Sequence, residues 1–218
     1  MEYSHRMEEI DFRLHSNRSM MVCGPSHAGK SSFVMELLGR RQEIFRDVPK
    51  RVVWCYGIYQ HSLIAELHSK GYETHQGIIS ASEIRPYDVI VLDDLLNESK
   101  NSEDVTIMFT RVAHHKPAFI IYIMQNLFPP GKEARTRSLN THYYVIFKNP
   151  RDKSQIEFLA RQIAPHKSKA LIAAFESATT KAHSYLFLDL TQECPDFVRY
   201  RGNIFHTPVD IYRIEQSN

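Results

Sequence analysis

The sequence has little cysteine: three residues in 218, with no C-x-x-C spacing among them. That scarcity argues against a disulfide framework, which needs several paired cysteines. Cys23 and Cys55 both lie in apolar, strand-like runs, and Cys194 is far from either in the chain. We therefore expect buried free thiols and a reducing compartment.

Long apolar runs are also missing. No segment approaches the roughly 20 apolar residues of a membrane-spanning helix, and the first 12 residues, MEYSHRMEEIDF, lack the apolar core of a signal peptide. We therefore expect an intracellular protein with no membrane attachment. Internal repeats and Gly- or Ser-rich linkers are absent as well. This favours one domain over residues 18–206, with a short polar lead-in over 1–17 and a tail over 207–218.

Charge of one sign is not in excess, because 27 basic residues face 25 acidic ones. Any nucleic-acid surface must therefore be local, or be assembled from several copies of the chain. The 12 histidines are scattered, and the adjacent pair His114-His115 lacks the partners of a known metal motif. A surface or helix-end role is the simpler interpretation of that pair.

Strand-like and helix-like segments alternate along the chain. Apolar, β-branched runs predict strands over residues 20–23, 52–56, 87–94, 119–124, 143–147 and 185–190. Helical spacing predicts helices over residues 30–42, 61–70, 103–115, 152–163 and 168–182. Residues 72–80 are ambiguous, with a short strand as one option, and residues 194–206 can add an edge. This alternation is typical of an α/β three-layer sandwich, with a mostly parallel central sheet and helices on both faces.

Residues 24–31 match the phosphate-binding pattern G-x-x-x-x-G-K-[ST] at every fixed position. A strand-like run leads into the motif and a helix-like run leads out of it, as a P-loop requires. Glycines permit a tight turn whose N–H groups face an anion, and the helix that begins there adds its positive dipole end. We expect Lys30 to contact the β- and γ-phosphates of ATP and Ser31 to ligate Mg²⁺. The predicted nucleotide-binding residues are Gly24, Pro25, Ser26, His27, Ala28, Gly29, Lys30, Ser31 and Ser32.

A second acidic element lies about sixty residues further on, where an apolar strand ends in Asp93-Asp94. Ligands of open α/β sheets bind at the carboxyl ends of strands, so Asp93 and Lys30 should face one cleft. We expect Asp93 to hold Mg²⁺ through water and Asp94 to polarise an attacking water. The alternative is a pair of aspartates that only caps a turn. Many related P-loop ATPases carry glutamate at this position, and the side chain of Asp94 is one methylene shorter.

The next predicted strand ends in Gln125, whose amide can contact both a γ-phosphate and the attacking water. Such a sensor is typical of the additional-strand class of P-loop ATPases, on the strand next to the acidic one. The alternative is a helix or turn cap, a role that Asn126 would serve equally well.

Residues 129–137 are loop-like in composition and form the densest basic patch near the site. Arg135 and Arg137 are the candidates for a catalytic arginine that reaches a neighbouring subunit's nucleotide, with Arg151 in reserve. Contact with DNA phosphates and a plain solvated loop are the competing interpretations.

Beyond the P-loop, several blocks carry a more specific resemblance. They are Phe109-Thr110-Arg111-x-x-His114-His115, Gln125-Asn126-Leu127-Phe128, Ser138-Leu139-Asn140, Phe147-Lys148-Asn149-Pro150-Arg151-Asp152, Leu159-Ala160-Arg161-Gln162-Ile163-x-Pro165, Tyr185-Leu186-x-Leu188-Asp189-Leu190 and Arg199-x-Arg201-x-x-Ile204-Phe205. In order and spacing, the chain resembles the packaging ATPases of the HerA/FtsK superfamily over residues 19–206. It is most similar to those of Maverick/Polinton elements, adintoviruses and virophages, with poxvirus-type packaging ATPases more distant.

The resemblance implies an ATP-driven motor, normally a homo-oligomeric ring, that pumps double-stranded DNA into a preformed viral capsid. It implies capsid or portal proteins as partners, and ATP with Mg²⁺ as cofactors. Carried over by position, residues 29–32 bind phosphate and metal, Asp93 and Asp94 form the Walker B element, and Gln125 is the sensor. The setting would be a host nucleus or a cytoplasmic virus factory.

Other functions remain open at this stage. A GTPase would need N-K-x-D, which the sequence lacks, and a terminase-type nuclease would need clustered acids after residue 150. A DNA helicase shares this site, and a nucleoside kinase could use residues 129–137 as a lid. A scaffold that binds ATP without turnover is the alternative that is not an enzyme.

Overall fold

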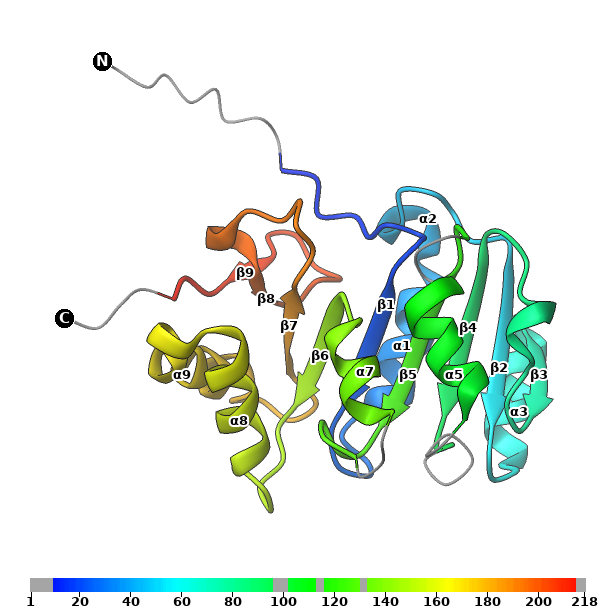
Figure 1. Cartoon of the computed structure of the whole chain (residues 1–218), viewed down its shortest axis with the longest axis horizontal. Coiled ribbons are helices and arrows are strands. Elements are labelled where there is room, and N and C mark those ends of the chain that lie inside the picture. The colour runs from blue at the N-terminus through cyan, green and yellow to red at the C-terminus, as the bar shows by residue number, and fades with distance from the viewer. Residues whose placement is uncertain (1–9, 96–101, 113–115, 130–132, 215–218) are drawn as a thin grey trace.

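The computed structural model describes residues 10–95, 102–112, 116–129 and 133–214 (Figure 1). Its strands are β1 (Ser19–Cys23), β2 (Arg51–Tyr56), β3 (Glu73–Gln76), β4 (Asp88–Asp93), β5 (Phe119–Met124), β6 (Tyr143–Phe147), β7 (Tyr185–Asp189), β8 (Tyr200–Gly202) and β9 (Asp210–Ile211). Its α-helices are α1 (Lys30–Gly39), α2 (Arg41–Ile44), α3 (His61–Ser69), α5 (Glu103–Ile107), α7 (Ala134–Leu139), α8 (Ser154–Ile163) and α9 (Ser168–Ala178).

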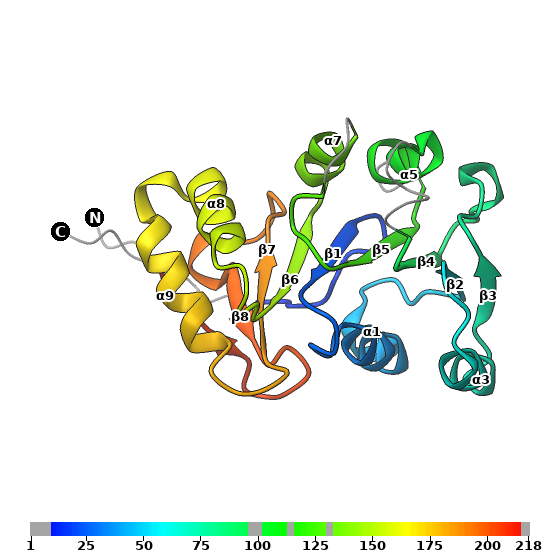
Figure 2. The ribbon, with the colours of Figure 1, turned by 90° about the horizontal axis from the view of Figure 1, so that it is seen from below.

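Within the described residues, the strands form one nine-stranded sheet in the order β3-β2-β4-β5-β1-β6-β7-β8-β9. The pairings from β3 through β6 are parallel, whereas β7, β8 and β9 are added in antiparallel fashion. Helices cover both faces, with α1 and α3 on one side and α5 and α7 on the other (Figure 2). The predicted α/β class and the mostly parallel sheet are confirmed.

The core forms on both faces because the central strands are apolar at consecutive positions rather than at alternate ones. On the α1 face, Trp54, Leu38 and Phe119 belong to one buried cluster. On the opposite face, Phe109 and Leu159 belong to the other. Burial of this kind fixes the sheet firmly, and the loops at its carboxyl edge are therefore carried on a rigid base.

The segment predicted to be helical from residue 103 is helical over its described part, as an α-helix to Ile107 and a π-helical turn over Met108–Val112. One local prediction was wrong. The segment expected to be a loop to residue 137 instead contains α7, which begins at Ala134. His114-His115 and residues 130–132, which belonged to these predictions, lie outside the described residues.

The described parts of the lead-in and the tail contact the domain. Leu14 is buried and forms an isolated β-bridge with Phe45. At the other end, β9 pairs with β8, and the Tyr212 N–H donates to the carbonyl of Tyr200 at 2.8 Å. The sheet therefore extends past residue 206, the end that the sequence analysis assigned to the ATPase domain.

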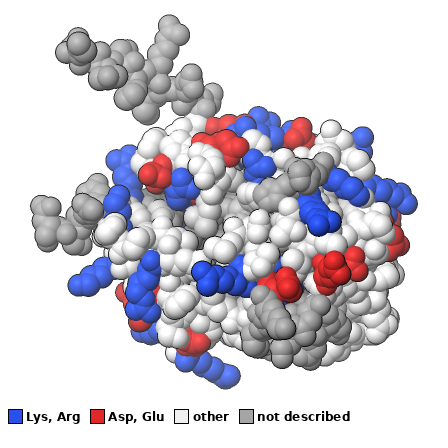
Figure 3. Space-filling view, in the orientation of Figure 1, with Lys and Arg blue, Asp and Glu red and all other residues white. Residues whose placement is uncertain are grey.

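Charged side chains of both signs are interspersed over the face shown in Figure 3. This agrees with the nearly balanced composition, +2 at pH 7. Among the residues that the structure describes, no helix combines the length and apolar character needed to cross a membrane.

Candidate functional site

The predicted site residues meet at the carboxyl edge of the parallel strands. β5 lies between β1, which leads into the P-loop, and β4, which ends at Asp93. The N–H of Gly24 donates to the Met124 carbonyl at 3.2 Å, so the start of the P-loop is tied to the end of β5. One extra strand between the two motif strands is the arrangement that defines the additional-strand class, and the structure therefore confirms that prediction.

The P-loop turns through backbone conformations that favour glycine. Gly29 has φ = +103°, a left-handed conformation that residues with a Cβ rarely adopt. Gly24 has a different requirement, because a Cβ there would lie 2.7 Å from the Cβ of Phe147. The helix α1 begins at Lys30, and its first free N–H groups therefore point toward the loop.

Lys30 is bent back over this loop. Its Nζ donates to the carbonyls of Gly24 and Pro25, both at 2.8 Å. Partial burial lowers the pKa of Lys30, while the nearby Asp93 carboxylate acts in the opposite direction. The ammonium group is therefore held at the P-loop, between its carbonyls and the Asp93 carboxylate, where a phosphate would lie close to it.

Asp93 is fixed by its neighbour on β2. Trp54 and Val91 are register partners, and Asp93 follows Val91 by two residues, so all three side chains lie on the α1 face. The Trp54 indole N–H donates to Asp93 Oδ2 at 3.2 Å, and the Trp54 side chain is fully buried. This contact could not be predicted from the sequence, because Trp54 belongs to no motif.

The electrostatics of Asp93 differ from those of an ordinary surface carboxyl. The pKa of Asp93 is raised to about 6, mainly by burial, and the adjacent Asp94 acts in the same direction. Hydrogen bonds from Trp54 and Ser31, together with the charge of Lys30, act in the opposite direction. A bound cation would relieve this penalty by favouring the ionised form.

The Ser31–Asp93 pair fits a magnesium site of the kind found in P-loop enzymes. Ser31 lies near enough to Asp93 to lower the pKa of its carboxyl, so the two oxygen-bearing side chains that would hold the ion lie close together. Among the described residues, no group of three or more His, Cys, Asp or Glu forms a metal cage. Mg²⁺ typically takes few protein ligands and completes its octahedron with phosphate oxygens and water.

Asp94 and Gln125 are exposed at the same edge. Asp94 has φ = +51°, a conformation that turns the chain sharply immediately after β4. Gln125 follows β5 directly and lines a cavity together with Gly24. Both side chains are therefore accessible at the edge of the sheet that carries the P-loop, and their expected roles stay predictions.

A second cavity, of about 780 Å³, opens beside the P-loop and shares Gly29, Lys30 and Ser31 with it. It is also lined by His183, whose Nδ1 lies 3.2 Å from the Ala28 carbonyl of the P-loop, and by Tyr185. Sequence reasoning missed His183 because it is distant in the chain and belongs to no recognised motif. The cavity is large enough for the parts of a nucleotide that extend beyond its phosphates.

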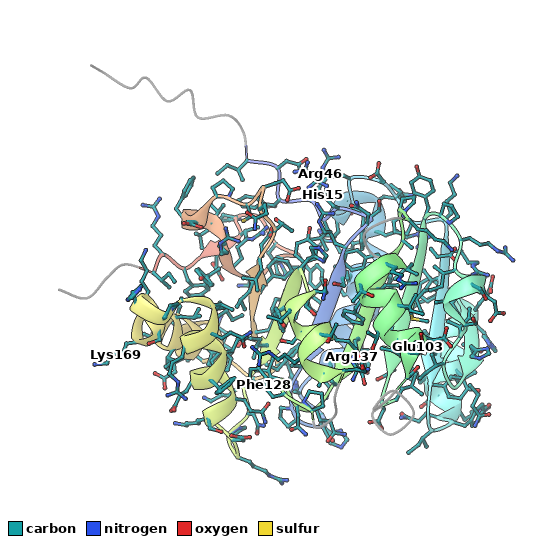
Figure 4. The ribbon with its side chains drawn as sticks, in the orientation of Figure 1. His15, Arg46, Glu103, Phe128, Arg137 and Lys169 are labelled. Atoms are coloured by element: carbon teal, nitrogen blue, oxygen red, sulfur yellow. The ribbon has the colours of Figure 1, made fainter. Side chains whose placement is uncertain are left out.

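The two arginines of the basic segment occupy different environments. Arg135 is exposed on α7, whereas Arg137, labelled in Figure 4, is 2% exposed. Burial lowers the pKa of Arg137, and Tyr122 and Glu133 partly offset that effect. Every role considered for this segment needs an accessible guanidinium, and in this conformation only Arg135 provides one. The reserve candidate, Arg151, is also exposed.

Together, the strand order and the loop geometry define the three-layer fold of a P-loop NTPase. No family model matches the chain, and no curated protein matches its sequence. Solved structures with this fold include the genome packaging NTPase B204 of Sulfolobus turreted icosahedral virus 2 in complex with ATP-gammaS, at 10% identity and a TM-score of 0.53. That match covers 93% of this chain and 100% of the neighbour.

Two further structures of the same kind match similarly. B204 of Sulfolobus turreted icosahedral virus 2 in complex with sulfate is 11% identical, with a TM-score of 0.54 and coverage of 94% of this chain and 100% of that one. B204, the DNA-packaging ATPase of Sulfolobus turreted icosahedral virus, is 10% identical with a TM-score of 0.55, covering 93% and 100%. At such identities the likeness shows a shared fold.

Proposed function

We propose that this chain is a Mg²⁺-dependent ATPase whose hydrolysis drives double-stranded DNA into a viral capsid. The observation that carries the proposal is the meeting of three chemistries at one sheet edge: the P-loop with Lys30, the acidic end of β4, and an amide at the end of the intervening β5. A site that only caps turns would not need a half-buried lysine and a half-buried carboxylate to lie near one another.

The residues take distinct roles in the proposed reaction. Lys30 moves from the Gly24 and Pro25 carbonyls to the β- and γ-phosphate oxygens. Ser31 and Asp93 would hold Mg²⁺, which neutralises charge on those oxygens. Asp94 accepts a hydrogen bond from the attacking water, and Gln125 orients the same water toward the γ-phosphate.

Packaging is the part of the proposal that rests on the fold and the motif blocks. The neighbours named above are a genome packaging NTPase and a DNA-packaging ATPase by description. The resemblance to HerA/FtsK-superfamily packaging ATPases of Maverick/Polinton elements, adintoviruses and virophages narrows the proposal further. Capsid or portal proteins are then the expected partners, and a nucleus or a cytoplasmic virus factory the expected setting.

We infer that the working form is a homo-oligomeric ring. A chain with a net charge of +2 offers little attraction to DNA by itself, and a ring would collect basic side chains from several copies in one channel. In such a ring, Arg135 is the preferred candidate for an arginine that acts on a neighbour's nucleotide, because its side chain is exposed on α7.

The first experiment measures steady-state ATP hydrolysis with and without linear double-stranded DNA, over a series of protein concentrations. The proposal predicts that turnover per subunit rises with concentration and rises again with DNA. Lys30→Ala serves as the inactive control for contaminating ATPases. Arg135→Ala should reduce turnover only in the assembled form.

Other outcomes would point to the alternatives. Phosphate transfer to a nucleoside in place of water would indicate a kinase, and strand separation of duplex DNA would indicate a helicase. Tight ATP binding without turnover, with or without DNA, would indicate a nucleotide-gated scaffold. Each of these results contradicts a packaging motor in a different way.

A further inference from the structure

The loop that follows β5 is held from outside by helix α8. We call residues 125–128 the sensor loop, because they begin with Gln125. Gln155, in the first turn of α8, accepts a hydrogen bond through Oε1 from the Leu127 N–H at 2.8 Å. Its Nε2 donates to Asn126 Oδ1 at 3.3 Å. One side-chain amide therefore contacts two successive residues of the sensor loop.

The Gln155 amide is itself oriented by Asp152. Nε2 of Gln155 donates to Asp152 Oδ2 at 2.7 Å, while Asp152 Oδ1 accepts from the Ser154 N–H at 3.1 Å and the Ser154 hydroxyl at 2.6 Å. Hydrogen bonds from Ser154 and Gln155 hold the pKa of Asp152 below its usual value. Asp152 is therefore an acceptor at neutral pH, and it directs Nε2 of Gln155 toward itself and Oε1 toward Leu127.

An aromatic contact joins the same two elements. Phe128, at the end of the sensor loop and labelled in Figure 4, meets Phe158 of α8 with ring centroids 4.8 Å apart and planes at 77°. Leu127, between the two contacts, is 4% exposed in the core. The sensor loop is thus fixed to α8 by polar and apolar contacts together.

These contacts bracket Gln125 without touching its side chain. Before it, the Met124 carbonyl accepts from the P-loop at Gly24; after it, the Leu127 N–H is held by Gln155. Gln125, Asp152 and Gln155 also line one cavity of about 210 Å³ that reaches Gly24. The backbone on both sides of Gln125 is therefore fixed, and one of the two attachments comes from α8.

We propose that Gln155 is a positioning residue for ATP hydrolysis, which sets the place of Gln125 and couples it to helix α8. The inference rests on the proposed function, in which Gln125 orients the attacking water. It also gives a purpose to two motif blocks that the sequence analysis could not connect, since residues 125–128 and Asp152 form one hydrogen-bonded unit through Gln155.

The expected signature is an effect on turnover and not on nucleotide binding. Gln155 makes no contact with Lys30 or Ser31, so Gln155→Ala should leave KM for ATP nearly unchanged. Misplacement of a catalytic group by about 1 Å can cost roughly a hundredfold, so we expect kcat to fall about ten- to a hundredfold. Gln125→Ala sets the reference for a complete loss of the sensor.

An exchange of hydrogen-bond donor and acceptor between Gln155 and Asp152 distinguishes a positioning role from general disruption of the fold. Gln155→Glu keeps an acceptor for Leu127 but turns a carboxylate oxygen toward Asp152, where two acceptors repel. Asp152→Asn turns an amide donor toward the Gln155 donor. The double variant Gln155→Glu with Asp152→Asn restores a donor opposite an acceptor, and the Asn126 amide can rotate to donate. We expect both single variants to be slow and the double variant to regain most of the lost kcat.

A second readout does not depend on activity. Hydrogen exchange of the Leu127 amide should accelerate in Gln155→Ala, while the exchange of β5 and of the P-loop amides stays as in the parent. Thermal unfolding of each variant identifies one that is simply misfolded, and Glu157→Gln, an exposed change on the same helix, is the matched control.

The outcomes separate the two proposals. If the parent hydrolyses ATP and Gln125→Ala does not, but Gln155→Ala has the parent kcat, the positioning role is wrong and the proposed function stands. The same holds if the double variant is no faster than the single ones, or if Leu127 exchanges at the parent rate in Gln155→Ala. If the parent itself has no turnover under any condition, the proposed function fails and this inference fails with it.

Discussion

The two ends of the sheet organise polar groups in opposite ways. From β3 to β6 the strands are parallel and their carboxyl ends share one edge, where Gln125 is exposed and Lys30 and Asp93 are partly accessible. From β7 to β9 the strands are antiparallel, and a charged pair is buried between them instead. Arg201 donates to Asp189 Oδ2 at 2.5 Å and its guanidinium lies over the ring of Phe187.

This difference shows that the two ends of one sheet can serve different purposes. Parallel strands direct several chain segments to one edge, which favours a site assembled from distant motifs. Antiparallel strands offer no common edge, and their charged groups are used to join β7, β8 and the N-terminal segment, since Arg201 also lies over the ring of Phe12. Substitutions at the parallel edge should therefore affect chemistry, and substitutions at the antiparallel end should affect stability.

The largest effect is expected for Lys30→Ala. Loss of the ammonium group that is bound to the P-loop carbonyls removes the charge that should face the β- and γ-phosphates. Removal of one preorganised electrostatic donor typically costs on the order of 10²–10³ in kcat, and ATP affinity should fall as well. Titration with a labelled nucleotide and steady-state kinetics check this, with thermal unfolding unchanged. Full nucleotide affinity in this variant would contradict the assignment of the P-loop.

Asp94→Asn should separate binding from turnover. The exposed carboxylate at φ = +51° is available to the attacking water, and loss of a general base typically costs on the order of 10²–10⁴ in rate. ATP binding should persist because Asp93 and the P-loop are intact. Glu66→Gln, an exposed change on α3, is the matched control. Hydrolysis by Asp94→Asn at the parent rate would show that another group acts on the water.

Arg201→Ala tests the other end of the sheet. It leaves the poorly exposed Asp189 carboxylate without its ion pair, and breaking such a pair from one side typically costs about 3–5 kcal/mol of the free energy of unfolding. Urea unfolding measures this, with Arg161→Ala on the surface of α8 as control. The fraction of Arg201→Ala that stays folded should hydrolyse ATP with the kcat of the parent. A fall in kcat without a loss of stability would overturn the division of work between the two ends.

The smallest effect concerns pH and Asp93. Its folded pKa is raised to about 6, so the folded state binds the proton more tightly than the unfolded chain. The protonated carboxyl therefore stabilises the fold below about pH 4, and that contribution is lost as pH rises through about 6. In metal-free buffer, Asp93→Asn should become more stable relative to the parent between pH 4 and 7, by about 2 kcal/mol. Parallel pH profiles of the two proteins would contradict this.

Much of the candidate site at the carboxyl edge of the parallel strands could be predicted, because its sequence signals are local. The P-loop is one continuous motif, and the acids of β4 and the amide after β5 each follow an apolar run directly. Strand order then brings them together by a general rule of parallel sheets. The α-helix at Ala134 was not predicted, because Pro129, Gly131 and nearby charges dominate the composition of that segment.

The contacts that refine the site could not be predicted, because each joins residues far apart in the chain. Trp54 reaches Asp93 from the neighbouring strand. Gln155 reaches Leu127 from α8, which follows β6 in the chain, and β6 is two strands away from β5 in the sheet. No periodicity marks such pairs. Arg137 illustrates the same limit, since its burial within α7 depends on tertiary packing and its sequence neighbourhood resembles a solvated basic loop.

The chain contains a single tryptophan, and its indole N–H is bound to the carboxylate expected to ligate the metal. Indole emission depends on nearby charge and on hydrogen bonding at the ring nitrogen, so the tryptophan fluorescence of this protein originates at its candidate magnesium site. Spectroscopy of the unlabelled chain can therefore follow metal and nucleotide loading in real time. Trp54→Phe would remove the signal and its hydrogen bond together, and it supplies the dark reference for such measurements.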